Sequence, residues 1–502
     1  MALIGLDIGT TGCKAHIFDD ELNFMASANR EYSVAIPHPG WAEQDAENVW
    51  MLAKDCLREG VIKTGVQDSV KAISLSVQGE AVVPVDKYGT ALRPMILGMD
   101  TRTDAQNQIL KDQFGARELF IKTGMPVHTT NTLPKLMWMK ENEPVLWRDA
   151  HKFLLYEDFI INKITGKAVI SQCLASRTQV FNLEKKFWSE EILEFLGLKK
   201  ERLAEVMVSG SPVGQMKADL ADEIGIRTRP LIGCGGHDQA CGALGAGLTQ
   251  PGLAMVSTGT AEVVEVSMDI PHLNEILFKS NVSVYLHTFP KLFVAMTLNQ
   301  SGAFILRWFR DTFCQSELEL AQKTGNDPYD LLLKNVGPDP SPVMLLPHFA
   351  GSGTPFFDTQ SKGALVGLTF ATTKKDIAKA ILDGLTLELR INLEILNHGG
   401  INISELRAIG GGAKSELWLQ LKADITGIPV AVPEMTEAAG MGAAILAGVA
   451  SGLFQTTASA IDSHIKIKKV YQPNLETKKL FDERHCVYQE LYPALIDINH
   501  KL

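Results

Sequence analysis

Apolar and polar positions along the chain first suggest strands that are joined by small-residue turns. The apolar run from Leu3 to Ile8 predicts a strand, a Gly-Thr-Thr-Gly turn follows it, and residues 14–18 predict the second strand of a β-hairpin. The pattern returns after residue 252, where an apolar run and a Ser-Thr-Gly-Thr turn precede the strand-like run 262–267. Because it occurs once in each half, we expect two related domains, each presenting one hydroxyl-rich turn.

The segments between and after these hairpins alternate between strand and helix patterns. In the first half, strands are expected at 71–76 and 81–85, and a helix is expected at 45–56. In the second half, the expected elements are a strand at 406–409, a helix at 415–426 and a strand at 429–432. This alternation is typical of mixed α/β domains that are built around sheets.

A glycine-rich segment, residues 242–252, is the expected boundary between the two domains. Its backbone freedom would also permit a hinge. We therefore predict an N-terminal domain of residues 1–245 and a C-terminal domain of residues 246–502. At roughly 150 residues per domain, a chain of 502 residues is long enough for two or three domains.

Composition narrows the class of protein. With 45% hydrophobic and 21% charged residues, the chain is globular rather than disordered or fibrous. The formal charge of −10 argues against a nucleic-acid partner. Seven scattered cysteines without a CxxC pair suggest neither a zinc site nor a disulfide framework. The uncharged stretch 438–461 is rich in glycine, which favours a helix packed on a sheet over a membrane span. We expect a cytoplasmic protein without a membrane partner.

The first turn has the residue types of a phosphate-binding loop. Its glycines permit a tight turn, so that backbone amides and hydroxyl groups can point at phosphate oxygens. Asp7, at the end of the strand, could hold a magnesium ion through water. The residues that this hypothesis assigns to the phosphates are Gly9, Thr10, Thr11 and Lys14. The alternative is an ordinary β-turn with surface threonines; the chain contains no Walker A motif.

A second candidate follows the glycine run 233–236. Asp238 lies after a predicted strand, where a ligand can approach the backbone and a carboxylate can orient a hydroxyl group and accept its proton. His237 and Gln239 flank it as hydrogen-bonding groups. The alternative is that Asp238 only caps the next helix.

Two more segments carry candidate binding groups. Residues 409–415 place three glycines between a strand and a helix, which suits a planar group or an anion, or simply a structural turn. Gln78 and Glu80 lie between two strand patterns, and Asp100 lies beside Arg102. The alternative for these acids is an exposed loop and a weak surface ion pair.

Two signature segments resemble those of the FGGY family of carbohydrate kinases. Residues 363–368 (Gly-Ala-Leu-Val-Gly-Leu) and 376–383 match its C-terminal signature at every position. Residues 132–142 match its N-terminal signature, and only Thr130 departs from it. With the opening Asp7-x-Gly-Thr-Thr, the resemblance runs from residue 3 to about residue 454.

The resemblance implies a fold and an activity. The implied fold is α/β, with two ribonuclease-H-like domains of the actin and hexokinase type flanking a central cleft. The first domain would bind the sugar, and the second would bind most of the nucleotide. The implied activity is an ATP-dependent sugar kinase that uses ATP and Mg²⁺.

The resemblance also assigns roles to residues. Asp238 is the expected catalytic base, and Asp7 and Asp238 are the expected metal ligands. The expected substrate-binding residues are Gln78, Glu80, Asp100, His237 and Gln239. The expected nucleotide-binding residues are Gly9, Thr10, Thr11, Lys14, Gly259, Thr260, Gly302, Gly411, Gly412 and Ser415.

The motifs do not point to a single substrate. Gln78 and Glu80 match the Gln-Arg-Glu-Thr of glycerol kinases without its arginine, whereas xylulose kinases usually carry Gln-Met-His-Gly. Residues 97–100 and 299–311 are closer to pentulose kinases, and the segment 237–239 also occurs in deoxyhexulose kinases. We therefore expect a ketose, first a pentulose such as xylulose; a glycerol or short-polyol kinase and a deoxyhexulose kinase are the alternatives.

Three further hypotheses complete the sequence analysis. The acids at positions 80 and 238 would repel an acidic sugar such as gluconate. A nucleotide-binding protein that has lost its chemistry is the rival from another class, and it would bind ATP without phosphorylating a sugar. A homodimer is among the assemblies that the sequence leaves open.

Overall fold

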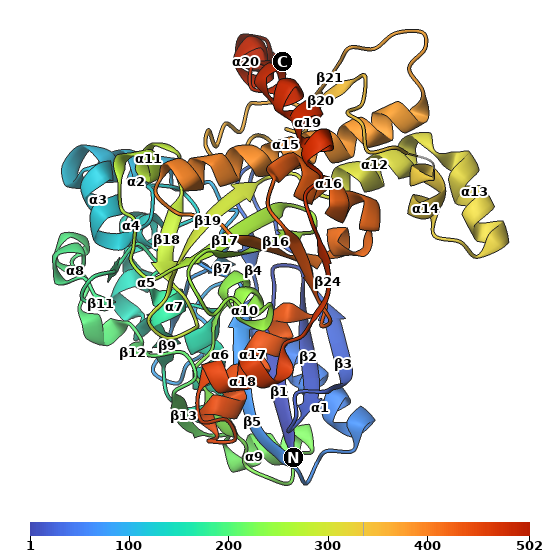
Figure 1. Cartoon of the computed structure of the whole chain (residues 1–502). Helices are drawn as coiled ribbons and strands as arrows, with labels where there is room; N and C mark the ends of the chain where they lie inside the picture. The colour runs from blue at the N-terminus through green and yellow to red at the C-terminus, as the bar shows by residue number, and fades with distance from the viewer. Residues whose placement is uncertain (335) are drawn as a thin grey trace.

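The computed structural model in Figure 1 describes residues 1–334 and 336–502 and contains two large mixed sheets. In spatial order, the first sheet holds β13 (Pro212–Gln215), β14 (Leu231–Gly233), β5 (Val70–Val77), β1 (Ala2–Ile8), β2 (Gly12–Asp19) and β3 (Phe24–Glu31), and β15 (Gly236–His237) also pairs with β5. The second holds β18 (Ser283–Leu286), β19 (Phe293–Asn299), β17 (Glu262–Met268), β16 (Leu253–Thr258), β22 (Glu405–Gly410), β23 (Val430–Pro433) and β24 (Ile467–Tyr471).

The two sheets share one local topology. In the first, β1 pairs antiparallel with β2 and parallel with β5. In the second, β16 pairs antiparallel with β17 and parallel with β22. Both predicted hairpins are therefore confirmed, as is the expectation of two related domains. The boundary at residues 245 and 246 remains a prediction.

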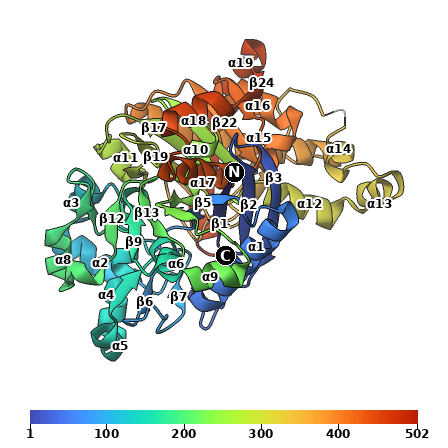
Figure 2. The ribbon, with the colours of Figure 1, turned by 90° about the horizontal axis from the view of Figure 1, so that it is seen from below.

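The predicted helices form, with shifted ends. α1 (Ala46–Thr64) begins after Asp45, whose side chain accepts hydrogen bonds from the backbone N–H groups of the first turn, and it runs past the predicted end at residue 56. In Figure 2, α1 lies against β2 and β3. α16 (Glu416–Thr426) is capped in the same way by Ser415. The predicted strand 81–85 is shorter, since β6 covers only Val83–Val85.

One helix of the C-terminal half packs on the N-terminal sheet. α17 (Ala438–Ala450) lies beside β1 and against α10 (Asp238–Gly245), as Figure 1 shows. It forms the first part of the uncharged stretch 438–461, so the predicted helix on a sheet is confirmed for residues 438–450, and the stretch continues into a turn and the start of α18 (Thr457–His464). Among the described residues, we find no helix whose length and apolar character would suffice to span a membrane.

The contact between β1 and α17 depends on glycine. A Cβ atom on Gly5 would lie 2.0 Å from the backbone oxygen of Gly440 and 2.9 Å from its carbonyl carbon. Since backbone atoms cannot move aside as a flexible side chain can, the helix itself would have to shift.

We predict that Gly5→Ala lowers the free energy of unfolding by about 3 kcal/mol or more, the upper end of typical overpacking costs. Thermal unfolding followed by circular dichroism measures the effect. Gly214→Ala in β13 is the matched control, because the nearest atom to its added Cβ would be the flexible end of Lys167 at 3.6 Å. Equal melting temperatures for the two variants would contradict the prediction.

Candidate active site

The predicted catalytic groups meet because parallel strands end at one edge of the first sheet. β1 and β15 both pair parallel with β5, so Gly9, Gln78 and Asp238 follow neighbouring strand ends. A cavity of about 190 Å³ lies at this edge, between the first domain and side chains of β17 and β19. Its lining includes the predicted residues Thr10, Gln78, Glu80, His237, Asp238 and Gln239, together with Val263 and Met296 of the second domain.

Asp238 has the environment of a general base. It is the first residue of α10, and the cap position of that helix is His237, so Asp238 is not the capping residue of the alternative hypothesis. Its Oδ1 accepts a hydrogen bond of 2.7 Å from the backbone N–H of Gln239 and lies 3.2 Å from Nε2 of His237. Burial, together with the negative charge of Asp7, raises the pKa of Asp238 to about 7. A base with this pKa accepts protons efficiently near neutral pH.

Asp7 and Asp238 are suited to share a divalent cation. The Oδ1 of Asp7 accepts a hydrogen bond of 2.7 Å from Oγ of Ser76, and burial raises the pKa of Asp7. A cation would relieve the mutual destabilisation of these two carboxylates. In residues 1–334 and 336–502 there is no ready cluster of three or more His, Cys, Asp or Glu side chains for a metal. The pair of carboxylates fits Mg²⁺ because Mg²⁺ is usually bound by one or two carboxylates, waters and substrate phosphates.

The loop that carries Glu80 is held in a strained backbone conformation. Glu80 has a φ of 60°, in the left-handed region that non-glycine residues seldom adopt. Its carbonyl oxygen accepts hydrogen bonds of 3.1 Å from both Thr132 Oγ1 and Lys135 Nζ. Both residues belong to the N-terminal signature, which forms α4 (Thr132–Asn142). Lys135 is fully buried, and desolvation lowers its pKa to about 7. The signature segment thus holds in place the loop of residues 78–80, which carries the predicted substrate-binding residues Gln78 and Glu80.

Arg177 is a site residue that the sequence analysis missed. Its Nε donates a hydrogen bond of 2.7 Å to Oε1 of Glu80, and its Nη2 forms an ion pair with the same oxygen. The positive charge of Arg177 offsets the negative charge of Glu80, so the predicted repulsion of an acidic sugar would come from Asp238 alone. No motif surrounds Arg177, which is separated from Glu80 by 97 positions in the sequence.

Asp100 requires a correction. Its Oδ2 accepts a hydrogen bond of 2.6 Å from the backbone N–H of Ala42 and another of 2.7 Å from Nη2 of Arg102. Its Oδ1 accepts a hydrogen bond of 2.9 Å from the backbone N–H of Arg102. Asp100 is fully buried and lies outside the residues that line the cavity. Direct substrate contact, which we expected, does not fit this placement; Asp100 orders the loop beside the cavity. The ion pair between Asp100 and Arg102 is buried, so the alternative hypothesis of a weak surface ion pair is also wrong.

His237 and Gln239 fill different positions beside Asp238. Nδ1 of His237 lies 3.3 Å from the hydroxyl of Tyr285, which donates a hydrogen bond to Glu265. These contacts connect the candidate base Asp238, through His237, to residues of the second sheet. Burial lowers the pKa of His237 well below its usual value, so the ring is neutral. Within the described part of the chain, Oε1 of Gln239 is buried without a hydrogen-bond partner, which leaves it available to a substrate hydroxyl.

The first turn, which is predicted to bind phosphate, is hydrogen-bonded to the loop of residues 78–80. Oγ1 of Thr10 donates a hydrogen bond of 3.2 Å to Oε1 of Gln78. Gln44 donates a hydrogen bond of 2.9 Å to the carbonyl oxygen of Thr10 and is another residue that the sequence analysis missed. Thr11 is exposed at the tip. Lys14 lies 3.3 Å from Oε2 of Glu437, directly before α17. It therefore already has an anionic partner, which a phosphate would have to replace.

The second group of predicted nucleotide residues meets at one edge of the second sheet. β16 and β22 run parallel, with Thr258 opposite Gly410, so the turn that contains Gly259 and Thr260 lies beside the segment that begins at Gly411. A Cβ atom on Gly412 would lie 2.8 Å from Cβ of Thr258.

The remaining two members of this group have structural contacts of their own. The backbone N–H of Gly302 donates a hydrogen bond of 2.7 Å to the carbonyl of Thr260. Ser415 accepts a hydrogen bond from the backbone N–H of Trp418 and caps α16. Gly302 thus lies against the second turn, whereas the hydroxyl of Ser415 is engaged by its own helix.

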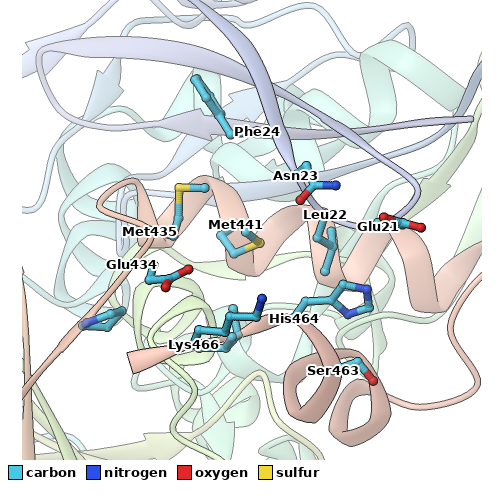
Figure 3. Close-up of a pocket in the computed structure, with 12 residues that line it drawn as sticks. Glu21, Leu22, Asn23, Phe24, Glu434, Met435, Met441, Ser463, His464 and Lys466 are labelled. Atoms are coloured by element: carbon cyan, nitrogen blue, oxygen red, sulfur yellow. The ribbon is translucent and has the colours of Figure 1, made fainter. Parts of the chain in front are cut away.

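A separate cavity of about 620 Å³ lies away from this edge. It lies between the β2–β3 turn, α17 with the segment before it, and the end of α18 (Thr457–His464) with the residues that follow, and Figure 3 shows its lining residues. Its labelled lining residues include Glu434, His464 and Lys466. It shares no lining residue with the cavity at Asp238, so we do not assign the chemistry to it.

The fold and the site together define a class of protein. Two sheets of the same topology, with a basic carboxylate and two hydroxyl-rich turns between them, are the features of a two-domain phosphotransferase. Sequence profiles of the N-terminal and C-terminal domains of the FGGY family of carbohydrate kinases match residues 2–245 and 254–451. The chain belongs to this family and is a carbohydrate kinase, an enzyme that phosphorylates alcohol groups.

Comparisons with individual proteins agree with this family assignment. Xylulose kinase of Staphylococcus epidermidis is 31% identical over 98% of this chain and 96% of its own length. Gluconokinase of Bacillus subtilis is 28% identical over 100% of this chain and 96% of its own length. A solved "xyloylose kinase" of Brucella ovis superimposes with a TM-score of 0.88 and 28% identity, covering 99% of this chain and 100% of that one. The expected two-domain fold of the actin and hexokinase type is confirmed.

Proposed function

We propose that this kinase transfers the γ-phosphate of ATP to a hydroxyl group of a ketose, and that the preferred ketose is a pentulose such as xylulose. The observation that carries the proposal is the cavity at Asp238, where a base with a pKa near 7 faces Gln78, Glu80 and Gln239. These side chains bind hydroxyl groups, and proteins named xylulose kinase are among the most similar relatives.

The proposed reaction assigns a task to each of these groups. The substrate hydroxyl gives its proton to Asp238 as its oxygen forms a bond to the γ-phosphorus, and the bond from that phosphorus to the bridging oxygen breaks and releases ADP. The turns at Thr10 and Gly259 would hold the phosphates. Asp7 and Asp238 would hold Mg²⁺, which neutralises phosphate charge when bound. Closure of the cleft would exclude water and suppress hydrolysis of ATP.

A panel of acceptors tests the proposal. We expect sugar-dependent ADP formation from MgATP with the highest kcat/KM for a pentulose, when pentuloses, hexuloses, deoxyhexuloses, glycerol, tetritols and aldonates are compared. The polar cavity of about 190 Å³ favours a short polyhydroxylated chain. Turnover of only glycerol or a tetritol would replace the ketose by a short polyol. Turnover of gluconate would agree with the offset charge of Glu80 and would replace the ketose by an acidic sugar. ATP binding without any turnover would support a protein that has lost its chemistry.

A further inference from the structure

The candidate substrate cavity has a smaller neighbour. This side cavity has a volume of about 70 Å³ and is lined by residues of both domains, among them His128, Ser283 and Thr354. Arg177 and Met296 line the side cavity and the substrate cavity alike. These two side chains therefore form the partition between the two cavities.

Contacts on both sides of the cleft hold the partition in place. Nη1 of Arg177 lies 3.9 Å from Sδ of Met296, and the guanidinium carbon lies 4.6 Å from the centre of the Tyr285 ring. The other edge of the guanidinium is bonded to Glu80. Arg177 is only 3% exposed. A guanidinium that is held by a carboxylate, an aromatic face and a thioether has little freedom to swing away.

The partition lies where a longer acceptor would extend. An acceptor with its reacting hydroxyl at Asp238 and a second hydroxyl at Glu80 meets Arg177 next, because Arg177 is bonded to the Glu80 carboxylate. Both Glu80–Arg177 bonds go to Oε1, whereas Oε2 lies near Gly98, another residue that lines the substrate cavity. One carboxylate oxygen is thus directed toward the substrate and the other toward the partition.

We infer that Arg177 and Met296 set the chain length of the acceptor. The inference rests on the proposed function, which supplies the polyhydroxylated acceptor. At roughly 30 Å³ per water-sized group, the side cavity of about 70 Å³ would hold about two such groups, the size of one further CHOH unit. The surface of the side cavity is mainly apolar and suits the carbon atoms of such a unit, and the lining residues Ser283 and Thr354 carry hydroxyl groups. With the partition in place, this space is closed to the substrate, and discrimination against one extra carbon unit is typically about 10- to 200-fold.

Met296→Ala tests the inference, because it opens the partition without removing either charge of the Arg177–Glu80 pair. We expect the ratio of kcat/KM for a hexulose to kcat/KM for the matching pentulose to rise at least about tenfold above that of the wild type. Met296→Leu, which conserves side-chain volume, should leave this ratio within about threefold. Arg177→Lys keeps a positive charge opposite Glu80 but removes the planar group, and it should raise the ratio as well.

The outcomes separate the inference from the proposed function. If the wild type phosphorylates no ketose or polyol, the proposed function fails whatever the variants do. If the wild type is active and folded Met296→Ala and Arg177→Lys keep its ratio, the inference alone is overturned. Titration calorimetry of a pentulose and a hexulose into each variant gives the corresponding ratio of binding affinities, which should rise in the same direction, so a variant with damaged turnover still decides the question.

Discussion

Replacing Asp238 by asparagine is expected to lower kcat by about a thousandfold while leaving the nucleotide site intact. General-base catalysis typically contributes about 10²- to 10⁴-fold, and asparagine keeps the shape of the side chain but cannot accept the proton. The hydrogen bond from the backbone N–H of Gln239 can still form, since the amide oxygen of asparagine is also an acceptor. The loss should therefore come from chemistry rather than from folding.

The measurement is the initial rate of ADP formation with the best acceptor of the panel. Calorimetry of ATP binding without divalent cation should give a Kd close to that of the wild type, because metal binding by Asp238 then plays no part. Glu434→Gln is the matched control; it makes the same type of change in the separate cavity of Figure 3 and should keep full activity. A kcat within tenfold of the wild type would remove Asp238 from the role of base.

Replacing Lys422 by alanine is expected to destabilise the second domain by about 3–5 kcal/mol. Lys422 of α16 is 2% exposed, and its Nζ donates a hydrogen bond of 2.8 Å to Oγ1 of Thr258 and another to Glu262, which is 1% exposed. Removing the ammonium group leaves the Glu262 carboxylate buried without its cationic partner. Because Thr258 and Glu262 flank the second phosphate turn, weaker ATP binding should accompany the loss of stability.

Chemical denaturation and thermal unfolding of the full chain measure this effect. Lys422→Met combined with Glu262→Gln should recover most of the stability, since replacing both charges leaves no buried unpaired ion. Lys469→Ala is the control for loss of a lysine from an exposed pair, because Lys469 and Glu416 are 48% and 76% exposed, and it should leave the stability close to that of the wild type. If Lys422→Ala were no worse than Lys469→Ala, the buried pair would not stabilise the domain.

Several parts of this kinase could be predicted because their signals are local. The two hairpins follow from short apolar runs around small-residue turns, and the placement of Asp238 follows from a strand and a glycine run directly before it. The cap at Ser415 is equally local, but the sequence analysis assigned that hydroxyl to the nucleotide, whereas the structure uses it to begin α16.

Other parts have no local signal. Arg177 follows the short helix α7 (Gln172–Ala175) without a motif, and only the fold brings it to Glu80. Asp100 was expected to bind the substrate because it lies beside Arg102 in a segment that resembles pentulose kinases; its burial against Ala42 and Arg102 is a tertiary fact. Tyr285 lies on a strand of the other domain, and no spacing in the sequence relates it to His237.

By itself, the sequence determined the α/β class, the repeated hairpin topology, the family and the position of the proposed catalytic carboxylate, because each depends on residues that are adjacent or regularly spaced along the chain. The tertiary structure decided which charges are paired, since a carboxylate changes its chemistry with the cation that the fold places beside it. It also decided the shape of the substrate cavity. Arg177 and Met296 come from different domains, and they form one wall only because packing of the two sheets brings them within contact distance.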